Sequence, residues 1–148
     1  MADAPRILIV TSRYYAHITA ELEAGVVEGL DKVGATHEFL EVPGAFEIPG
    51  AISMAAQTGE WDGFVALGCV IRGETSHYDL ICEQVAHGLM ELSLSGVPLG
   101  FGVLTVENEE QAKVRADRKQ KNKGAEVVAA VLRMVGLSYR FNKGAENE

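Results

Sequence analysis

The sequence predicts an α/β fold in which a parallel β-sheet lies between two layers of helices. Short apolar runs typical of buried strands alternate along the chain with segments of helical periodicity, and the connections are short. Such alternation produces parallel strands joined by right-handed crossovers, with helices on both faces. A chain of 148 residues, 47% of them apolar, is long enough to form this arrangement as one domain, from residue 1 to residue 148.

In the first half of the chain, each expected strand is followed by an expected helix. The predicted order is a strand at Ile7–Val10, a helix at Thr19–Val33, a strand at Thr36–Val42 and a helix ending near Thr58. Gly34 and Gly59 follow these helices, where a left-handed residue ends a helix. The segment Pro43–Pro49 is expected to be the turn that leads into the second helix.

The second half begins with Phe64–Ile71, which carries no charge before Arg72 and is therefore expected to be a central strand covered on both faces. The elements expected after it are a helix from Ser76 to near Gly96, a strand at Leu99–Leu104, a helix starting at Asn108 and a helix at Gly124–Val135. Ser76 and Asn108 are the predicted side-chain caps of their helices. Gly136 is expected to end the last helix and leave a loose polar tail, Arg140–Glu148.

Composition and charge narrow the classes of function. A net charge of -8 argues against general nucleic-acid binding, which depends on neutralising phosphates. The N-terminus carries no basic region followed by a long apolar segment, and the two cysteines lack Cys-x-x-Cys spacing, so we expect a cytoplasmic protein without disulfides. The segment Arg115–Lys123 holds five of the thirteen basic residues and is a candidate anchor for a small anion.

The most informative stretch is Gly68–Asp79, in which a strand runs through Arg72 and Gly73 into a helix that opens at His77. A helix start offers unpaired N–H groups and the positive end of the helix dipole, so it suits a phosphate, and His77 would place a proton carrier beside it. The same residues also fit an ordinary turn with an exposed histidine. Because ligands of open parallel sheets bind at the carboxyl ends of the strands, this stretch lies at the expected place for a site.

Several common uses of this architecture do not fit the strand ends. Thr11–Tyr15 lacks the Gly-x-Gly-x-x-Gly of dinucleotide-binding domains, and the chain contains no phosphate loop ending in Gly-Lys-Ser/Thr. The acidic residues that hold magnesium in receiver domains are also missing from the first and third strand ends. The spacing of the histidines indicates no metal site.

Three motifs in order resemble the lumazine synthase family. They are Pro43–Pro49 (PGAFEIP), Gly68–Asp79 (GCVIRGETSHYD) and Phe101–Asn108 (FGVLTVEN), and the resemblance extends from about Ile7 to Val135. It implies a flavodoxin-like, three-layer α/β/α sandwich with a four-stranded parallel sheet. It also implies a cofactor-free transferase of riboflavin biosynthesis. The implied reaction condenses 5-amino-6-(D-ribitylamino)uracil with 3,4-dihydroxy-2-butanone 4-phosphate to 6,7-dimethyl-8-ribityllumazine, releasing phosphate and water.

The resemblance assigns a role to each strand-end loop. The residues matching those that bind the ribitylaminouracil within one subunit are Tyr14, Ala45, Phe46, Glu47, Cys69, Val70 and Ile71. Tyr14 would stack on the pyrimidine, where the family usually has Phe or Trp. Glu74 and Thr75 match the phosphate-binding pair, and His77 matches the catalytic histidine. Cys69 is expected to line the site rather than act as a nucleophile.

A neighbouring subunit completes the implied site. The resemblance assigns Phe101 and Lys123 to the ribitylaminouracil and Arg115 to the phosphate, in a homopentamer whose active sites lie at subunit interfaces. The loop Asp117–Lys121 departs from the Gly-Thr-Lys-Ala-Gly-like run that shapes contacts between pentamers in hollow capsids, so a bare pentamer or another small assembly is expected.

Two further departures are Tyr15, where Asn is frequent, and Glu74, where a small residue is frequent; the Glu74 side chain is expected to point away from the phosphate. Two other functions stay open at this point, because a fold alone does not fix an activity. One is a non-catalytic scaffold that binds lumazine or flavin. The other is a riboflavin synthase of the related archaeal type, for which the lumazine is the substrate.

Overall fold

The computed structural model describes residues 4–73 and 76–146 and contains one parallel sheet. Its strands are β1 (Arg6–Ser12), β2 (Thr36–Val42), β3 (Gly63–Ile71) and β4 (Leu99–Val106), in the spatial order β2-β1-β3-β4. All neighbouring pairs are parallel. β3 is therefore central and almost wholly buried, as its uncharged sequence predicted, and every strand ends at the same edge of the sheet.

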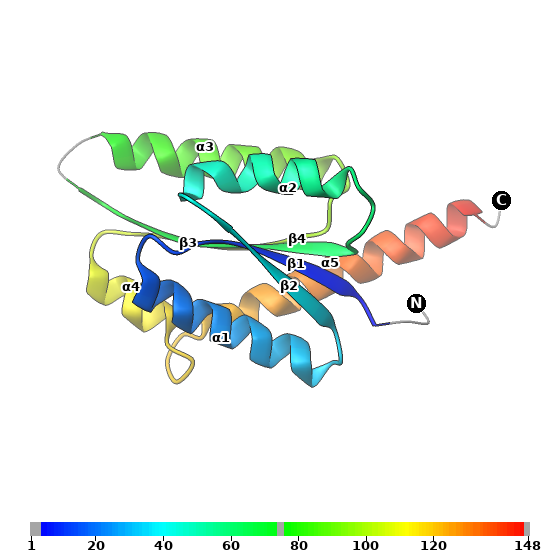
Figure 1. The fold of residues 1–148 in the computed structure, drawn as a ribbon, viewed down its shortest axis with the longest axis horizontal. Helices are drawn as coiled ribbons and strands as arrows, with labels where there is room; N and C mark the ends of the chain where they lie inside the picture. The colour runs from blue at the N-terminus through cyan, green and yellow to red at the C-terminus, as the bar shows by residue number, and fades with distance from the viewer. Residues whose placement is uncertain (1–3, 74–75, 147–148) are drawn as a thin grey trace.

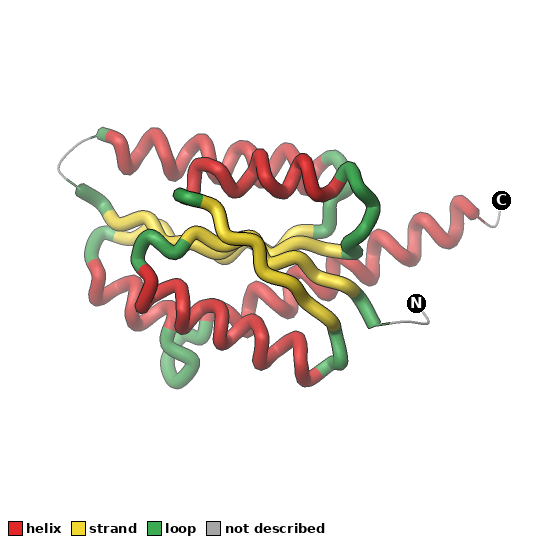
Figure 2. Tube along the Cα trace, viewed as in Figure 1, coloured by secondary structure: helices red, strands yellow, loops and turns green. Residues whose placement is uncertain are grey.

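Helices cover both faces of this sheet (Figure 1). One layer contains α2 (Ile48–Ala56) and α3 (His77–Leu94), preceded by the short 3₁₀ helix η1 (Ala45–Glu47); the other contains α1 (Ala16–Lys32), α4 (Glu109–Ala116) and α5 (Lys123–Glu146). Figure 2 shows the sheet between the two helical layers. The predicted three-layer α/β/α class is confirmed. Within the described residues, no helix is both long and apolar enough to cross a membrane.

Alternating side chains of the strands build one apolar core on each face. Ile7 and Ile9 of β1 pack with α1, α4 and α5, whereas Leu8 and Val10 pack with α2 and α3. Because both faces of β1 and β3 are buried in this way, the sheet is a firm support for the loops at its carboxyl edge.

The sequence predicted the order of the elements correctly but not all of their ends. The predicted end of the last helix at Gly136 is wrong, since α5 continues to Glu146 through most of the tail that was expected to be loose. Gly34, Gly59 and Gly96 do adopt the left-handed conformation near helix ends, but Gly136 does not. A glycine inside a helix costs only about 1 kcal/mol relative to alanine, so it does not end a helix by itself.

The two predicted side-chain caps have opposite outcomes. The Asn108 side chain accepts a hydrogen bond of 2.9 Å from the backbone N–H of Gln111, which confirms the cap of α4. Within the described chain, the Ser76 hydroxyl accepts no such bond, so the predicted cap of α3 is wrong. The backbone explains the difference, because Asn108 is extended (φ -152°, ψ 168°), as a capping residue must be, whereas Ser76 is helical (φ -71°, ψ -2°).

Candidate active site

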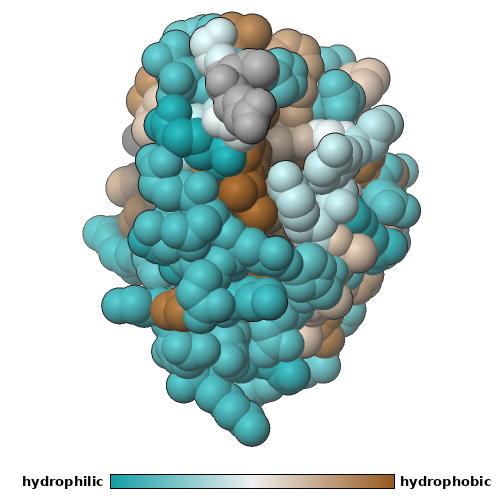
Figure 3. Space-filling model, turned by 90° about the vertical axis from the view of Figure 1, so that its left-hand side faces the viewer, coloured by the Kyte–Doolittle hydropathy of each residue, from teal (hydrophilic) through white to brown (hydrophobic). Residues whose placement is uncertain are grey.

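A pocket of about 720 Å³ opens at the carboxyl edge of the sheet. Its wall is formed by residues from the ends of β1, β2 and β3 and from the start of α3: Ser12, Tyr14, Tyr15, Pro43, Gly44, Ala45, Phe46, Glu47, Cys69, Val70, Ile71, Gly73, His77, Tyr78, Leu80 and Ile81. Figure 3 looks onto this end of the molecule, where a strip of apolar surface lies between hydrophilic surroundings. The pocket is therefore an open apolar site with a few polar groups, as binding sites for small molecules usually are.

The end of β1 brings two aromatic rings to this pocket. Tyr14 and Tyr15 lie edge to face, with ring centroids 5.0 Å apart and an interplanar angle of 77°. Arg13 is fixed just before them by hydrogen bonds of 2.9 and 3.0 Å to the Glu23 carboxylate. Tyr14 is 77% exposed and so presents a free ring face, whereas Tyr15 packs against the core. The pair offers a flat apolar surface on which a heteroaromatic ligand can stack.

The loop after β2 adds a second aromatic ring and a carboxylate. Phe46 and Glu47 belong to η1, which begins directly after Gly44, and both line the pocket. A Cβ atom at Gly44 would lie 3.1 Å from a Glu47 carboxylate oxygen, so the glycine leaves room for that side chain. Glu47 can accept hydrogen bonds from ligand hydroxyls there.

β3 supplies the floor of the pocket through Cys69, Val70 and Ile71. The Cys69 side chain is buried, and this burial raises the pKa of its thiol to about 11. A thiol with such a pKa is neutral at physiological pH and is a poor nucleophile. Its environment thus suits the lining role expected from the sequence better than a covalent one.

α3 begins with the residues that carry proton chemistry. His77 is its first residue and lines the pocket, and Asp79 lies in the same first turn. Among the described residues, no group of three or more His, Cys, Asp or Glu side chains could hold a metal ion.

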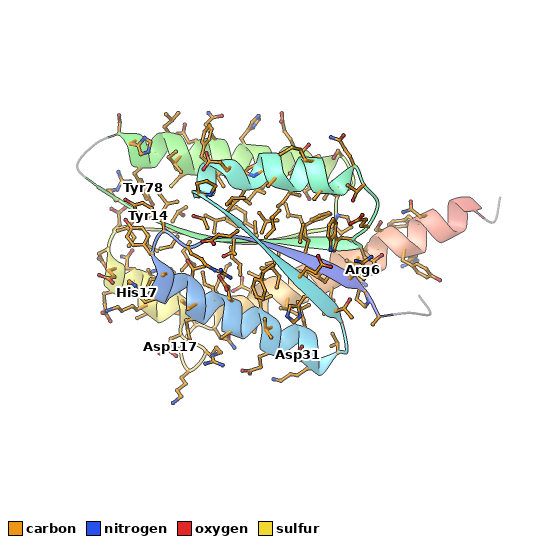
Figure 4. All side chains as sticks on the ribbon, in the orientation of Figure 1. Arg6, Tyr14, His17, Asp31, Tyr78 and Asp117 are labelled. Atoms are coloured by element: carbon orange, nitrogen blue, oxygen red, sulfur yellow. The ribbon has the colours of Figure 1, made fainter. Side chains whose placement is uncertain are left out.

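Tyr78 is a pocket residue that the sequence motif left unassigned. Figure 4 shows it near Tyr14 at the carboxyl end of the sheet, far from Arg6 at the opposite end, and both tyrosines line the pocket. Burial raises the pKa of the Tyr78 hydroxyl, and hydrogen bonding to Cys82 adds to this shift. The sequence did offer one signal for Tyr78. It follows His77 at the start of a helix whose first turn faces the strand ends, so it could have been expected near the pocket.

The pocket of a single chain unites part of the predicted site. It contains every described residue that the resemblance assigned to one subunit, which are Tyr14, Ala45, Phe46, Glu47, Cys69, Val70, Ile71 and His77. Phe101, Arg115 and Lys123, which the resemblance assigned to a neighbouring subunit, do not line it. Glu74 and Thr75, the predicted phosphate-binding pair, lie outside the described residues.

The residues outside the pocket occupy other surfaces of the chain. Phe101 is 41% exposed on β4, the strand at one edge of the sheet. The Arg115 guanidinium donates a hydrogen bond of 3.2 Å to the Gln111 carbonyl of α4. The Lys123 ammonium, at the start of α5, lies 3.2 Å from the Glu126 carboxylate.

Comparisons with known proteins agree on one family. The family model described as 6,7-dimethyl-8-ribityllumazine synthase matches residues 4–138. The chain is 49% identical over 138 residues to the protein of that name from Sphingopyxis alaskensis, covering 93% of this chain and 98% of that protein. It is 48% identical to the one from Erythrobacter litoralis, with coverage of 92% and 97%, and 47% identical to the one from Zymomonas mobilis, with coverage of 93% and 99%.

Proposed function

Because the chain belongs to the 6,7-dimethyl-8-ribityllumazine synthase family, we propose that the pocket at the carboxyl edge of its sheet is one half of the active site. The protein is a transferase of riboflavin biosynthesis. It condenses 5-amino-6-(D-ribitylamino)uracil with 3,4-dihydroxy-2-butanone 4-phosphate to 6,7-dimethyl-8-ribityllumazine, with release of phosphate and water.

One observation carries the assignment of the site. The described residues that the resemblance gives to one subunit lie in one pocket, although they come from separate segments between Tyr14 and His77. A protein of the same fold with another function would not be expected to bring aromatic rings, a carboxylate and a histidine together from these segments.

The pocket residues have distinct roles in the proposed mechanism. Tyr14 and Phe46 offer apolar ring surface to the pyrimidine, and Glu47 accepts hydrogen bonds from ribityl hydroxyls. Backbone groups at Cys69–Ile71 recognise the pyrimidine edge. Thr75 and the backbone N–H of Glu74 bind the phosphate, together with Arg115 of a neighbouring subunit.

His77 moves the protons that the reaction requires. The uracil amine condenses with the ketone to an imine with loss of water, and phosphate is then eliminated. The resulting enol rearranges to a ketone, and the second nitrogen closes the ring on this carbonyl with loss of a second water. Each step transfers protons, and a histidine can accept and return them near neutral pH. Orienting the two substrates can lower the activation barrier by about 7–11 kcal/mol. One acid/base group can raise the rate by about 10²–10⁴-fold.

The proposed assembly is a homopentamer with active sites between subunits. Phe101, Arg115 and Lys123 are then offered by β4, α4 and α5 of one subunit to the pocket of the next. The departure at Asp117–Lys121 favours a bare pentamer or another small assembly over a capsid. A cytoplasmic location is consistent with the free thiols of Cys69 and Cys82.

The activity is tested by mixing the purified protein with the two substrates and following the absorbance and fluorescence of the lumazine. A synthase produces lumazine from the two substrates. A non-catalytic scaffold would bind added lumazine without forming it, and a riboflavin synthase of the archaeal type would convert added lumazine to riboflavin. The family relationship favours the first outcome. Light scattering on the same sample determines the size of the assembly.

A further inference from the structure

Arg72 forms an unusually complete set of contacts directly after β3. Its Nε donates a hydrogen bond of 2.7 Å to the Glu107 carboxylate, and its Nη2 donates one of 3.3 Å to the Asp79 carboxylate. Its guanidinium carbon also lies 4.4 Å from the centroid of the Tyr78 ring, in a cation–π arrangement. One side chain therefore engages two carboxylates and an aromatic ring at the same time.

These contacts join three separate segments around the pocket. Tyr78 and Asp79 belong to the first turn of α3, and Glu107 belongs to the connection between β4 and α4. The backbone N–H of Arg72 also donates a hydrogen bond of 2.9 Å to the Val106 carbonyl, which fixes the base of the side chain at the end of β4. The start of α3 is thus tied to the two strands beside it through Arg72.

Arg72 itself does not line the pocket, but Tyr78, whose ring the guanidinium contacts, does. His77, which precedes Tyr78 in the chain, lines the pocket as well. We propose that Arg72 is a positioning residue, which fixes the first turn of α3 so that His77 and Tyr78 keep their orientation toward the substrates. This inference rests on the proposed function of the pocket and adds to it a residue that touches neither substrate.

The geometry requires arginine rather than a positive charge alone. Arginine has a planar fork that can donate to two carboxylates while its face stacks on a ring, whereas lysine presents a compact charge without a flat face. Arg72 is 41% exposed in its side chain, and ion pairs at such surfaces add little to folding stability. Its removal is therefore expected to alter the site more than the stability of the fold.

The test compares Arg72→Met and Arg72→Lys with matched variants at Arg6. The Arg6 side chain is 51% exposed, lies 3.6 Å from the Glu38 carboxylate and 5.9 Å from the centroid of the Trp61 ring, and does not line the pocket. Arg6→Met and Arg6→Lys therefore remove an ion pair and a cation–π contact at the opposite end of the sheet (Figure 4). Light scattering must show the same assembly for all variants that are compared.

We expect Arg72→Met to lower kcat roughly 10- to 100-fold, as a small displacement of a catalytic group can do, with a smaller change in KM for either substrate. Arg72→Lys should recover only part of the loss, and both Arg6 variants should keep a kcat near that of the wild type. A kcat for Arg72→Met equal to that of Arg6→Met overturns the inference. Full recovery by Arg72→Lys overturns the requirement for the planar fork.

A second measurement does not depend on turnover. The rate at which diethyl pyrocarbonate modifies His77 is followed by mass spectrometry, with the exposed His87 of the same helix as internal reference. Arg72→Met should change the rate at His77 but not at His87, and Arg6→Met should change neither. An unchanged rate at His77 contradicts the positioning role. A wild-type protein that forms no lumazine contradicts the proposed function instead.

Discussion

Cys69 illustrates how the surroundings of one side chain decide its chemistry. It lies at the end of the central strand in the pocket wall, where a reactive thiol would be a candidate nucleophile. Burial raises its pKa to about 11, because the thiolate would lose contact with water, and the negative charge of Glu109 acts in the same direction. The sequence identified Cys69 as a lining residue only by resemblance, since no motif encodes the depth of burial.

This pKa predicts slow alkylation of Cys69 in the folded protein. The thiolate is the reacting form, so iodoacetamide at pH 8 should modify Cys69 far more slowly than a free cysteine, and the rate should rise as the pH approaches 11. Mass spectrometry at timed intervals gives the rate, with the unfolded protein in urea as control. Cys82 is less deeply buried and should react first. Preferential labelling of Cys69 at pH 8 would contradict the prediction.

The second prediction at this scale concerns His77. Replacing it with Ala should lower kcat by about 10²-fold or more, while substrate binding is largely retained, because an acid/base group acts mainly in the transition state. The matched control is His87→Ala, which removes an exposed histidine from the same helix outside the pocket. Steady-state kinetics of lumazine formation measures both variants. Unchanged turnover in His77→Ala would remove its catalytic assignment.

At the scale of elements, the sequence predicted the order of strands and helices correctly. It failed at those helix ends where the same residue type also occurs inside helices. Short apolar runs identified β1, β3 and β4. β2 contains Glu38 and Glu41 and was expected only from its place between a helix end and a turn, yet it has the predicted ends. Since the carboxyl ends of parallel strands meet at one edge, the candidate site could be assigned to that edge before any contact was known. Gly136 and Ser76 were misjudged because glycine and serine occur both within and at the ends of helices, and the backbone conformation alone decides between them.

The close contact between α1 and α5 gives a prediction about Gly124, a glycine in the first turn of α5. A Cβ atom at Gly124 would lie 2.9 Å from the Leu22 carbonyl oxygen and 2.9 Å from the Val26 nitrogen, both of them backbone atoms of α1. Backbone of a packed helix cannot move aside as a side chain can, so Gly124→Ala should destabilise the protein by about 1–3 kcal/mol. The thermal unfolding midpoint should fall accordingly.

The matched control lies in the same helix. A Cβ atom at Gly136 would meet nothing within 4 Å among the described residues, and the position is an exposed helix interior. Gly136→Ala should therefore stabilise the protein by about 0.5–1 kcal/mol. Equal midpoints for the two variants would show that α1 and α5 do not approach each other as closely as described.

At the scale of the whole molecule, the pocket of one chain is open, and Phe101, Arg115 and Lys123 lie outside it. Both observations favour a site that a second subunit completes. Tyr14 and Phe46 are 77% and 54% exposed at the pocket, so a single chain leaves much of both rings open to solvent. The proposed contributions from the next subunit come from β4, at one edge of the sheet, and from α4 and the start of α5. Contact between two different surfaces of identical chains closes into a ring when the rotation permits, which is the geometry of a cyclic pentamer.

A shared site predicts that two inactive variants restore activity when they assemble together. His77→Ala lacks the proton carrier of its own pocket, and Arg115→Ala lacks the arginine that it offers to the next pocket. In a mixed ring, a pocket of Arg115→Ala beside a subunit of His77→Ala has both groups intact, and random assembly of equal amounts gives about a quarter of such sites.

Co-expression of the two variants with different affinity tags, followed by purification on both tags, provides the mixed rings. Lumazine formation should then reach about a quarter of the wild-type rate per subunit, if both parent variants are nearly inactive. The control is a ring of two differently tagged His77→Ala subunits, in which every pocket lacks the histidine and no activity should return. Mixed rings no more active than their parents would mean that Arg115 serves the pocket of its own chain or none, and the site would not be shared in the proposed way.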